Sequence, residues 1–170
     1  MKKFLLIPLF LFLLIAIFET VGIRFNYTES MPVGFYQKIH TAKIKDGDLA
    51  AVCLPNAIAI VGLKNYYLAR GSCQNGSTPV LKKIVAVPGD HVVLSNQFIV
   101  VNKIFYYAPT QTKDPQNHAV KKFISDGDYK HIHTYWLYGA NDPQYSWDSR
   151  YYGGVKQSNI IGIYRPLLTL

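Results

Sequence analysis

Residues 80–90 read Val-Leu-Lys-Lys-Ile-Val-Ala-Val-Pro-Gly-Asp, an apolar run that contains two adjacent lysines and ends in a turn signal. A short run of this kind, rich in β-branched residues, predicts a strand over 80–87, and Pro88-Gly89-Asp90 predicts the turn after it. Side chains alternate between the two faces of a strand, so Lys82 and Lys83 point in opposite directions. The segment therefore predicts a strand that places Lys82 in apolar surroundings.

On both sides of this strand the pattern is mainly β. Further strands are expected over 48–54, 91–94, 98–101, 104–107, 135–138 and 160–164, with turns at 95–97 and 102–103 and with Arg165-Pro166 closing the last strand. One short helix is expected, carrying Ile58, Val61, Leu63 and Leu68, capped by Asn56 and ending before Gly71. The polar, proline-containing stretch 108–128 is expected to form an exposed loop or a lid.

The N-terminus carries a membrane-length apolar segment. Residues 4–18 contain no charged side chain, and the apolar pattern resumes at 21–23. About 20 residues at ~1.5 Å each span the ~30 Å hydrocarbon core, and Lys2-Lys3 favours a cytoplasmic N-terminus. A cleaved secretory signal is the alternative, but the run is long for one and lacks a clean small-x-small pair after it. We expect a membrane anchor at 1–24 and one extracytoplasmic domain at 25–170.

Charge and length narrow the class of partner. The chain has 170 residues and a formal net charge of +8. A net positive charge favours binding to anionic lipid surfaces or acidic partners. The lysines are scattered, with no long basic run and no nucleic-acid motif, so nucleic acid is not an expected partner.

The two cysteines, Cys53 and Cys73, can pair if the domain is exported to an oxidising compartment. A disulfide that closes a loop of about 20 residues would stabilise the fold by ~3 kcal/mol in the chain-entropy model. Two unpaired core thiols are the alternative. A catalytic cysteine would need a partnered histidine, and none lies nearby in the sequence.

Ser30-Met31-Pro32 follows the apolar segment and would place a hydroxyl nucleophile at the bilayer surface. A serine attacks an amide only if a base removes its proton. None of the five histidines, at positions 40, 91, 118, 131 and 133, lies in a nucleophile-base signature. His131-x-His133 could be a metal pair but has no obvious third ligand. We therefore expect no metal and no other cofactor.

Lysine is the other possible base. Its ordinary pKa is ~10.4, and burial in apolar surroundings lowers it by disfavouring the ammonium form. Lys82, hydrogen-bonded to a serine, would form the Ser-Lys variant of the nucleophile-base pair. The alternative is that Lys82-Lys83 is a charge doublet on an edge strand, which discourages aggregation.

Three segments, in this order, resemble the type I signal peptidase family of Ser-Lys proteases. They are Ser30-Met31-Pro32, Lys82-Lys83-x-x-x-x-Pro88-Gly89-Asp90 and Ser146-x-Asp148-Ser149-Arg150-Tyr151-x-Gly153. Within the family, Ser30-Met31-Pro32-x-Gly34-x-Tyr36 and Tyr138-Gly139-x-Asn141 most resemble the TraF-type conjugative transfer peptidases. The resemblance covers nearly the whole chain, and it implies the folded β-sheet domain of the signal peptidases after one N-terminal transmembrane helix.

The resemblance also implies roles for individual residues. Ser30 would be the nucleophile and Lys82 the general base. The Ser30 backbone N–H and the Thr28 hydroxyl would form the oxyanion hole. Ser146 would orient the Lys82 amine, while Asp148 and Arg150 would pair and brace the site.

Other positions are more peripheral. Met31 and Pro32 are assigned to substrate binding, with Met31 packing beneath the nucleophile, and Lys83 falls at a structural position. The family's usual Gly-Asp-Asn reads Gly139-Ala140-Asn141-Asp142 here. Asp142, in a shifted position, could substitute for the missing acidic residue at that turn.

By this resemblance, the expected protein is a serine endopeptidase of the bacterial inner membrane with its catalytic domain on the periplasmic side. It would remove signal or leader peptides from exported precursors and mature a pilin or a secretion-system subunit for conjugation. The expected partners are a precursor with a signal peptide and membrane lipid. A general secretory signal peptidase is one alternative, and a non-catalytic membrane-anchored scaffold is another. The anchor disfavours a cytoplasmic self-cleaving Ser-Lys regulator.

Overall fold

The computed structural model describes residues 20–107 and 109–170. Most of the expected membrane anchor at 1–24 lies outside the described residues. Within those residues, no helix is both long and apolar enough to cross a membrane. Ile23 and Arg24, which the sequence placed in the anchor, instead belong to strand β1 (Ile23–Asn26) and pair with Gln37 and Tyr36. The folded domain therefore begins no later than Ile23.

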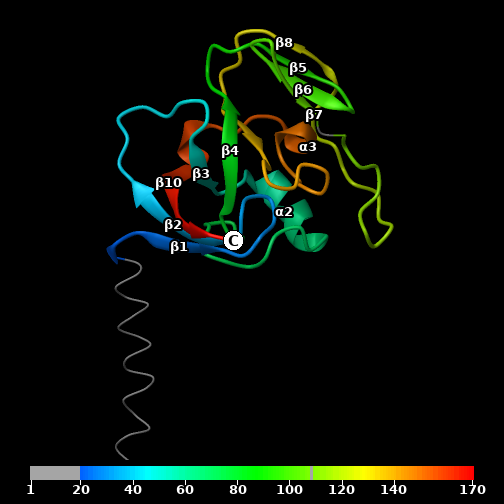
Figure 1. Ribbon diagram of the computed structural model, residues 1–170. Helices are drawn as coiled ribbons and strands as arrows, with labels where there is room; N and C mark the ends of the chain where they lie inside the picture. Colours follow the sequence, from blue (N-terminus) through cyan, green and yellow to red (C-terminus); the bar gives the residue numbers. More distant parts are fainter. Residues whose placement is uncertain (1–19, 108) are drawn as a thin grey trace, which may run out of the picture.

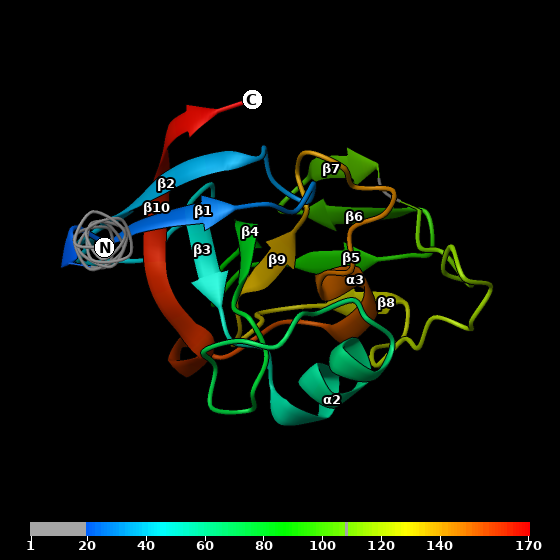
Figure 2. The same ribbon diagram turned by 90° about the horizontal axis from the view of Figure 1, so that it is seen from below.

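Two antiparallel sheets make up the described part of the chain (Figure 1). The larger has the spatial order β1, β2 (Gly34–Ile39), β10 (Ile160–Thr169), β3 (Leu49–Val52), β4 (Val80–Ala86) and β9 (Trp136–Tyr138). The smaller has the order β7 (Ile104–Tyr107), β6 (Phe98–Val101), β5 (Val92–Leu94) and β8 (Gly127–Tyr129). Seen from below, β10 curves between β2 and β3 (Figure 2). The mainly β prediction is thus confirmed.

Strand β4 is an interior strand. It pairs with β3 on one side and with β9 on the other. The edge-strand explanation of the Lys82-Lys83 doublet is therefore wrong. The turn after β4 forms as expected, with Val87 N–H donating to Asp90 Oδ2 at 2.8 Å and Gly89 at a φ of +100°, where glycine is favoured.

Helix α2 (Asn56–Lys64) is the short helix that the sequence predicts, with different ends. Its N-cap is Pro55, and no side chain caps it, so the capping role given to Asn56 is wrong. The helix stops at Lys64, well before Gly71, because Tyr66 adopts a left-handed φ of 60°. Leu68 is still buried, now from the loop after the helix.

Several elements differ from the sequence prediction. A second helical turn, α3 (Ser149–Tyr152), follows the Asp148 N-cap, and a 3-10 turn η1 (Gln157–Asn159) precedes β10. Strand β10 continues beyond Pro166 by means of a β-bulge. The sequence analysis did not predict β1 and β2, the strands that flank Ser30, as separate elements. The expected loop at 108–128 is ordered in part by a Lys113–Ala119 bridge and ends in β8.

Three buried apolar clusters support this arrangement. One joins the large sheet to α2 and α3 and includes Ile84, and a second joins β4 and β9 to the small sheet and includes Val85. The third, formed by Met31, Tyr36, Ala51 and Leu81, lies beneath the Ser30 loop. The packing of this third cluster thus fixes the Ser30 loop against β4.

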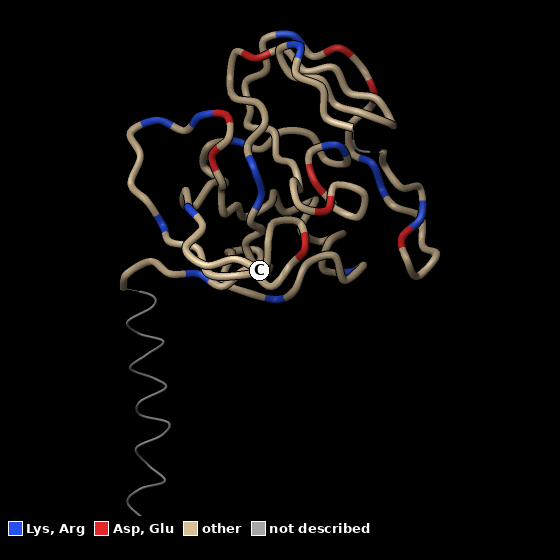
Figure 3. Tube along the Cα trace, in the orientation of Figure 1, with Lys and Arg blue, Asp and Glu red and all other residues tan. Residues whose placement is uncertain are grey.

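Lysine and arginine are dispersed along the described trace (Figure 3).

Candidate active site

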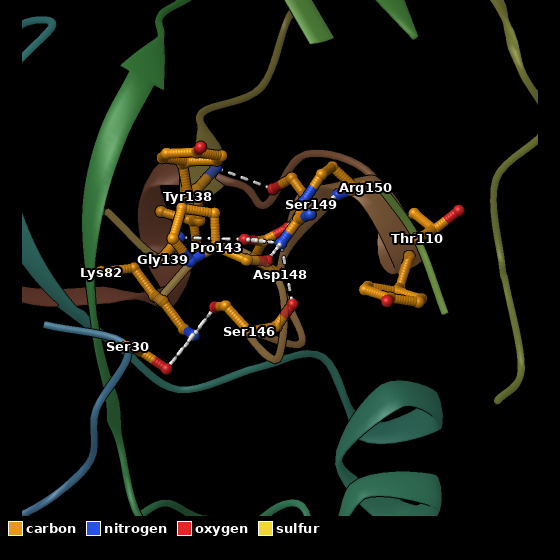
Figure 4. Close-up of polar contacts among 12 residues, drawn as sticks. Ser30, Lys82, Thr110, Tyr138, Gly139, Pro143, Ser146, Asp148, Ser149 and Arg150 are labelled. Carbon is orange, nitrogen blue, oxygen red and sulfur yellow. Dashed lines mark hydrogen bonds and ion pairs between the residues drawn. The ribbon is translucent and has the colours of Figure 1, made fainter. Parts of the chain in front are cut away.

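Three polar side chains from distant parts of the chain meet beside β4 (Figure 4). Lys82 comes from β4, Ser30 from the loop between β1 and β2, and Ser146 from the loop before α3. Lys82 Nζ lies 2.6 Å from Ser30 Oγ and 2.5 Å from Ser146 Oγ. The two serine oxygens are 3.5 Å apart. The amine is therefore bound by two hydroxyls and can exchange a proton with either.

The Lys82 amine is in a dry environment, with only 3% of the residue exposed. Burial lowers the pKa of Lys82 from 10.5 to about 8. The nearby Asp148 carboxylate opposes this effect by raising the pKa, and the Arg150 guanidinium adds a smaller lowering effect. A substantial fraction of the amine is therefore neutral near pH 8 and able to accept a proton.

Asp148 and Arg150 form a fully buried ion pair behind this site, each 0% exposed. Arg150 Nε donates to Asp148 Oδ1 at 2.8 Å, and a terminal guanidinium nitrogen donates to Asp148 Oδ2 at 2.9 Å. The same guanidinium donates to the carbonyl oxygens of Ser146 at 2.9 Å and Pro143 at 2.6 Å. The pair therefore fixes the backbone that carries Ser146.

The turn at Gly139 links this ion pair to the three polar groups. Gly139 N–H donates to Asp148 Oδ2 at 2.9 Å. A methyl group at position 139 would lie 1.9 Å from Ser146 Oγ, so only glycine leaves room for that hydroxyl. The sequence suggested Asp142 as the acidic residue that supports this turn. Asp142 instead accepts a hydrogen bond from Tyr145 N–H at 3.4 Å, and Asp148 is the carboxylate that binds the turn.

The Thr28 hydroxyl, the expected oxyanion donor, makes a hydrogen bond to another residue. It donates to Asn26 Oδ1 at 2.9 Å. The orientation of the Asn26 amide is well defined, because its Nδ2 faces three carbonyl oxygens. The Thr28 hydroxyl therefore has no proton to offer an oxyanion in this state, and it would have to rotate away from Asn26 to provide one.

Met31 and Pro32, assigned to substrate binding from the sequence, do not line the cavity next to Ser30. Met31 is 5% exposed and packs in the cluster beneath the nucleophile. Pro32 contributes its carbonyl oxygen, which accepts from the Tyr36 hydroxyl at 2.6 Å. Both residues shape the loop from below.

A cavity of about 860 Å³ opens beside Ser30 and Lys82. Its lining includes residues 24–28, 78–82, 111 and 113–115. Its aromatic lining was not foreseen from the sequence and comprises Phe25, Tyr27, Tyr66, Tyr67, Tyr145, Trp147 and Tyr151. Tyr67 and Tyr151 also hold the 109–126 segment, through Asp114 at 3.0 Å and Gln111 N–H at 2.7 Å. A mostly apolar groove of this size can hold an extended peptide segment.

Comparison with known proteins identifies the family of this chain. The family described as signal peptidase, peptidase S26, matches residues 1–168. The chain belongs to this family. The signal peptidase resemblance seen in the sequence is thereby confirmed, and membership of family S26 implies a serine peptidase.

Several similar proteins carry the name TraF. A conjugal transfer protein TraF of Agrobacterium fabrum is 27% identical over 150 residues, covering 87% of this chain and 83% of that protein. A plasmid transfer protein TraF of Escherichia coli is 29% identical, with 87% and 84% covered. A probable conjugal transfer protein TraF of Sinorhizobium fredii is 29% identical, with 87% and 78% covered.

A solved signal peptidase I of Enterococcus faecalis is also similar, with a TM-score of 0.40 and 18% identity, covering 73% of this chain and 98% of that one.

The structure also describes the two cysteines and the residue types that could bind a metal. Cys53 and Cys73 are joined by a disulfide. Among the described residues, no group of three histidine, cysteine or carboxylate side chains could hold a metal ion.

Proposed function

We propose that this member of family S26 is a membrane-anchored Ser-Lys endopeptidase that removes leader peptides from exported precursors, among them a pilin or secretion-system subunit used in conjugation. The observation that carries the proposal is the buried Lys82 amine 2.6 Å from the Ser30 hydroxyl at the wall of an apolar groove. The TraF names of the relatives support the conjugative context.

In the proposed reaction, the neutral Lys82 amine takes the Ser30 hydroxyl proton as the serine oxygen attacks the scissile carbonyl. The C=O bond becomes a C–O⁻ bond in the tetrahedral intermediate, and the Ser30 backbone N–H stabilises that oxyanion. The Lys82 ammonium then gives its proton to the leaving amine. The peptide bond breaks and an ester to Ser30 remains.

Hydrolysis of the ester repeats the steps with water as the nucleophile. Lys82 takes a proton from the water and returns it to Ser30 Oγ when the ester bond breaks. Ser146 keeps the amine in place through both halves, because its hydroxyl is held 2.5 Å from Nζ. No metal or cofactor is needed for either half.

The proposed location is the bacterial inner membrane, with one N-terminal span and the domain from Ile23 onward on the periplasmic side. Two features support it. The apolar segment at 4–18 is preceded by Lys2-Lys3. The Cys53–Cys73 disulfide suits an oxidising compartment. Anchoring enzyme and precursor in one bilayer raises their effective concentration.

The test is cleavage of a pilin-type precursor by the full-length protein in proteoliposomes, followed by mass measurement of both products. We expect cleavage by wild type and loss of cleavage in Ser30→Ala, in Lys82→Ala and in Lys82→Arg, whose guanidinium stays protonated. Lys83→Arg, on the opposite face of β4, is the matched control and should stay active.

Each alternative function has its own result in this assay. Cleavage of general secretory precursors in preference to the pilin-type precursor would indicate a general signal peptidase. Activity equal to wild type in Ser30→Ala would exclude the proposed chemistry. Wild-type protein that cleaves neither class of precursor would indicate a non-catalytic scaffold.

A further inference from the structure

The loop that carries Ser30 is held by two asparagines that are distant from each other in the sequence. Asn26 lies at the end of β1, is 5% exposed, and donates from Nδ2 to the carbonyl oxygens of Thr28 at 2.8 Å, Met31 at 3.0 Å and Pro32 at 3.1 Å. Asn141 follows the Gly139 turn. Its side chain donates to Glu29 O at 3.0 Å and its backbone N–H to Ser30 O at 3.1 Å.

Every carbonyl oxygen from residue 28 to residue 32 therefore accepts a hydrogen bond from one of these two residues. In a planar trans peptide the C=O and the following N–H point in opposite directions. Holding Glu29 O against Asn141 thus turns the Ser30 N–H away from Asn141. Asn141 does not line the cavity, whereas Ser30 does.

We propose that Asn26 and Asn141 are positioning residues that fix the Glu29–Ser30 peptide plane, so that the Ser30 N–H is presented to the substrate carbonyl before substrate binds. This inference rests on the proposed peptidase function. It gives the two asparagines a role in stabilising the oxyanion and none in proton transfer. A preorganised donor of this kind needs no reorganisation during the reaction.

The chain contains its own control for this role. Asn75 makes the same local motif as Asn26: its Oδ1 accepts from Ser77 N–H at 3.1 Å and from Ser77 Oγ at 2.7 Å, and its Nδ2 donates to a remote carbonyl, Leu54 O, at 2.7 Å. Asn75 does not line the cavity beside Ser30. An Asn→Asp change at either site keeps the acceptor and removes the donor.

The experiment compares full-length wild type, N26D, N141D, N75D and S30A in proteoliposomes on a cleaved precursor, measuring kcat and KM separately. We expect N26D and N141D each to lower kcat by roughly 10- to 100-fold, as expected for a misplaced catalytic group, with KM changed by less than about threefold. N75D should keep the wild-type kcat even if its melting temperature falls.

A second readout isolates the oxyanion. Affinity for a peptide boronic acid, which forms a tetrahedral adduct with a serine, should fall in N26D and N141D in parallel with kcat. The same peptide with an ordinary amide in place of the boronic acid is not cleaved by S30A. It should bind equally well to S30A and to the double variants S30A/N26D and S30A/N141D. A merely structural role would weaken both ligands together.

The outcomes separate the two proposals. Wild-type kcat in N141D, which changes an exposed side chain and should fold, overturns this inference alone, as does an equal loss of kcat in N75D. Parallel losses for boronate and amide peptide also overturn it. Wild-type protein that cleaves no better than S30A overturns the proposed function and this inference with it.

Discussion

Lys82 Nζ lies 2.6 Å from Ser30 Oγ, although the two residues are 52 positions apart in the sequence. The contact forms because β4 is an interior strand, while the loop between β1 and β2 passes over it on the packed cluster that includes Met31 and Leu81. A lysine in this position has lost most of its contact with water. Burial, more than any single neighbour, is therefore what makes its amine a usable base.

The dependence of activity on pH should follow the Lys82 amine. Its pKa is lowered to about 8, and the neutral form is the active one, so kcat/KM should rise about tenfold per pH unit below pH 8 and level off above it. The measurement is precursor cleavage at low substrate concentration between pH 5 and pH 10. A flat profile over that range would contradict a lysine base.

The buried Lys82 should also destabilise the folded state at neutral pH. Lowering its pKa from 10.5 to about 8 corresponds to roughly 3 kcal/mol, because one pKa unit is about 1.4 kcal/mol. Between these two values the unfolded chain binds more protons than the folded one, so stability rises with pH and the cost disappears by about pH 10.5.

Lys82→Met should therefore gain stability relative to wild type at pH 7 and lose that advantage as the pH rises from 8 to 10.5. Thermal unfolding of the detergent-solubilised protein, followed by circular dichroism, measures the difference. Lys83→Met, on the opposite and partly exposed face of β4, is the matched control. A difference between Lys82→Met and wild type that does not vary with pH would contradict the assignment.

Gly139→Ala should abolish most activity while leaving the domain folded. The added methyl group would meet Ser146 Oγ at 1.9 Å and lie 3.4 Å from Lys82 Nζ, so Ser146 must move away from the amine. A displacement of about 1 Å can reduce the rate about 100-fold. Gly127→Ala is the control, since its methyl group meets only Tyr129, at 3.8 Å or more. Equal activity in the two variants would count against a role for Ser146.

Arg150→Met should affect both stability and the pH profile. It leaves Asp148 buried and unpaired, which costs about 3–5 kcal/mol. Arg150 lowers the Lys82 pKa and Asp148 raises it, so losing the guanidinium should move the midpoint of the kcat/KM profile to higher pH. Denaturant unfolding and the pH profile test the two effects.

Combining Asp148→Asn with Arg150→Met removes both charges and should recover part of the lost stability. It should also move the midpoint below that of wild type, in the opposite direction to Arg150→Met alone, because the Asp148 charge, which raises the lysine pKa more than Arg150 lowers it, is then absent as well. A midpoint that is the same in wild type and Arg150→Met would show that the guanidinium does not act on Lys82.

Much of the β structure was readable from local pattern. The turns at 88–90 and 102–103, the strands on either side of them and the short helix α2 depend on residues adjacent in sequence, and these were predicted correctly. The end of α2 was not, because it depends on the left-handed backbone at Tyr66 and on the packing of Leu68. The extension of β10 past Pro166 was also missed, because a bulge accommodates the proline only where β2 lies alongside.

The sequence by itself determined most of the strands, the apolar setting of Lys82 and, through three ordered motifs, the family. Only the tertiary structure decided which groups meet: that Lys82 contacts both Ser30 and Ser146, that Thr28 donates to Asn26, and that Asn141 holds the Ser30 loop. The physical reason is that strand formation is governed by side chains a few residues apart. Distances within the site depend instead on strand pairing and loop packing between segments as much as 116 residues apart.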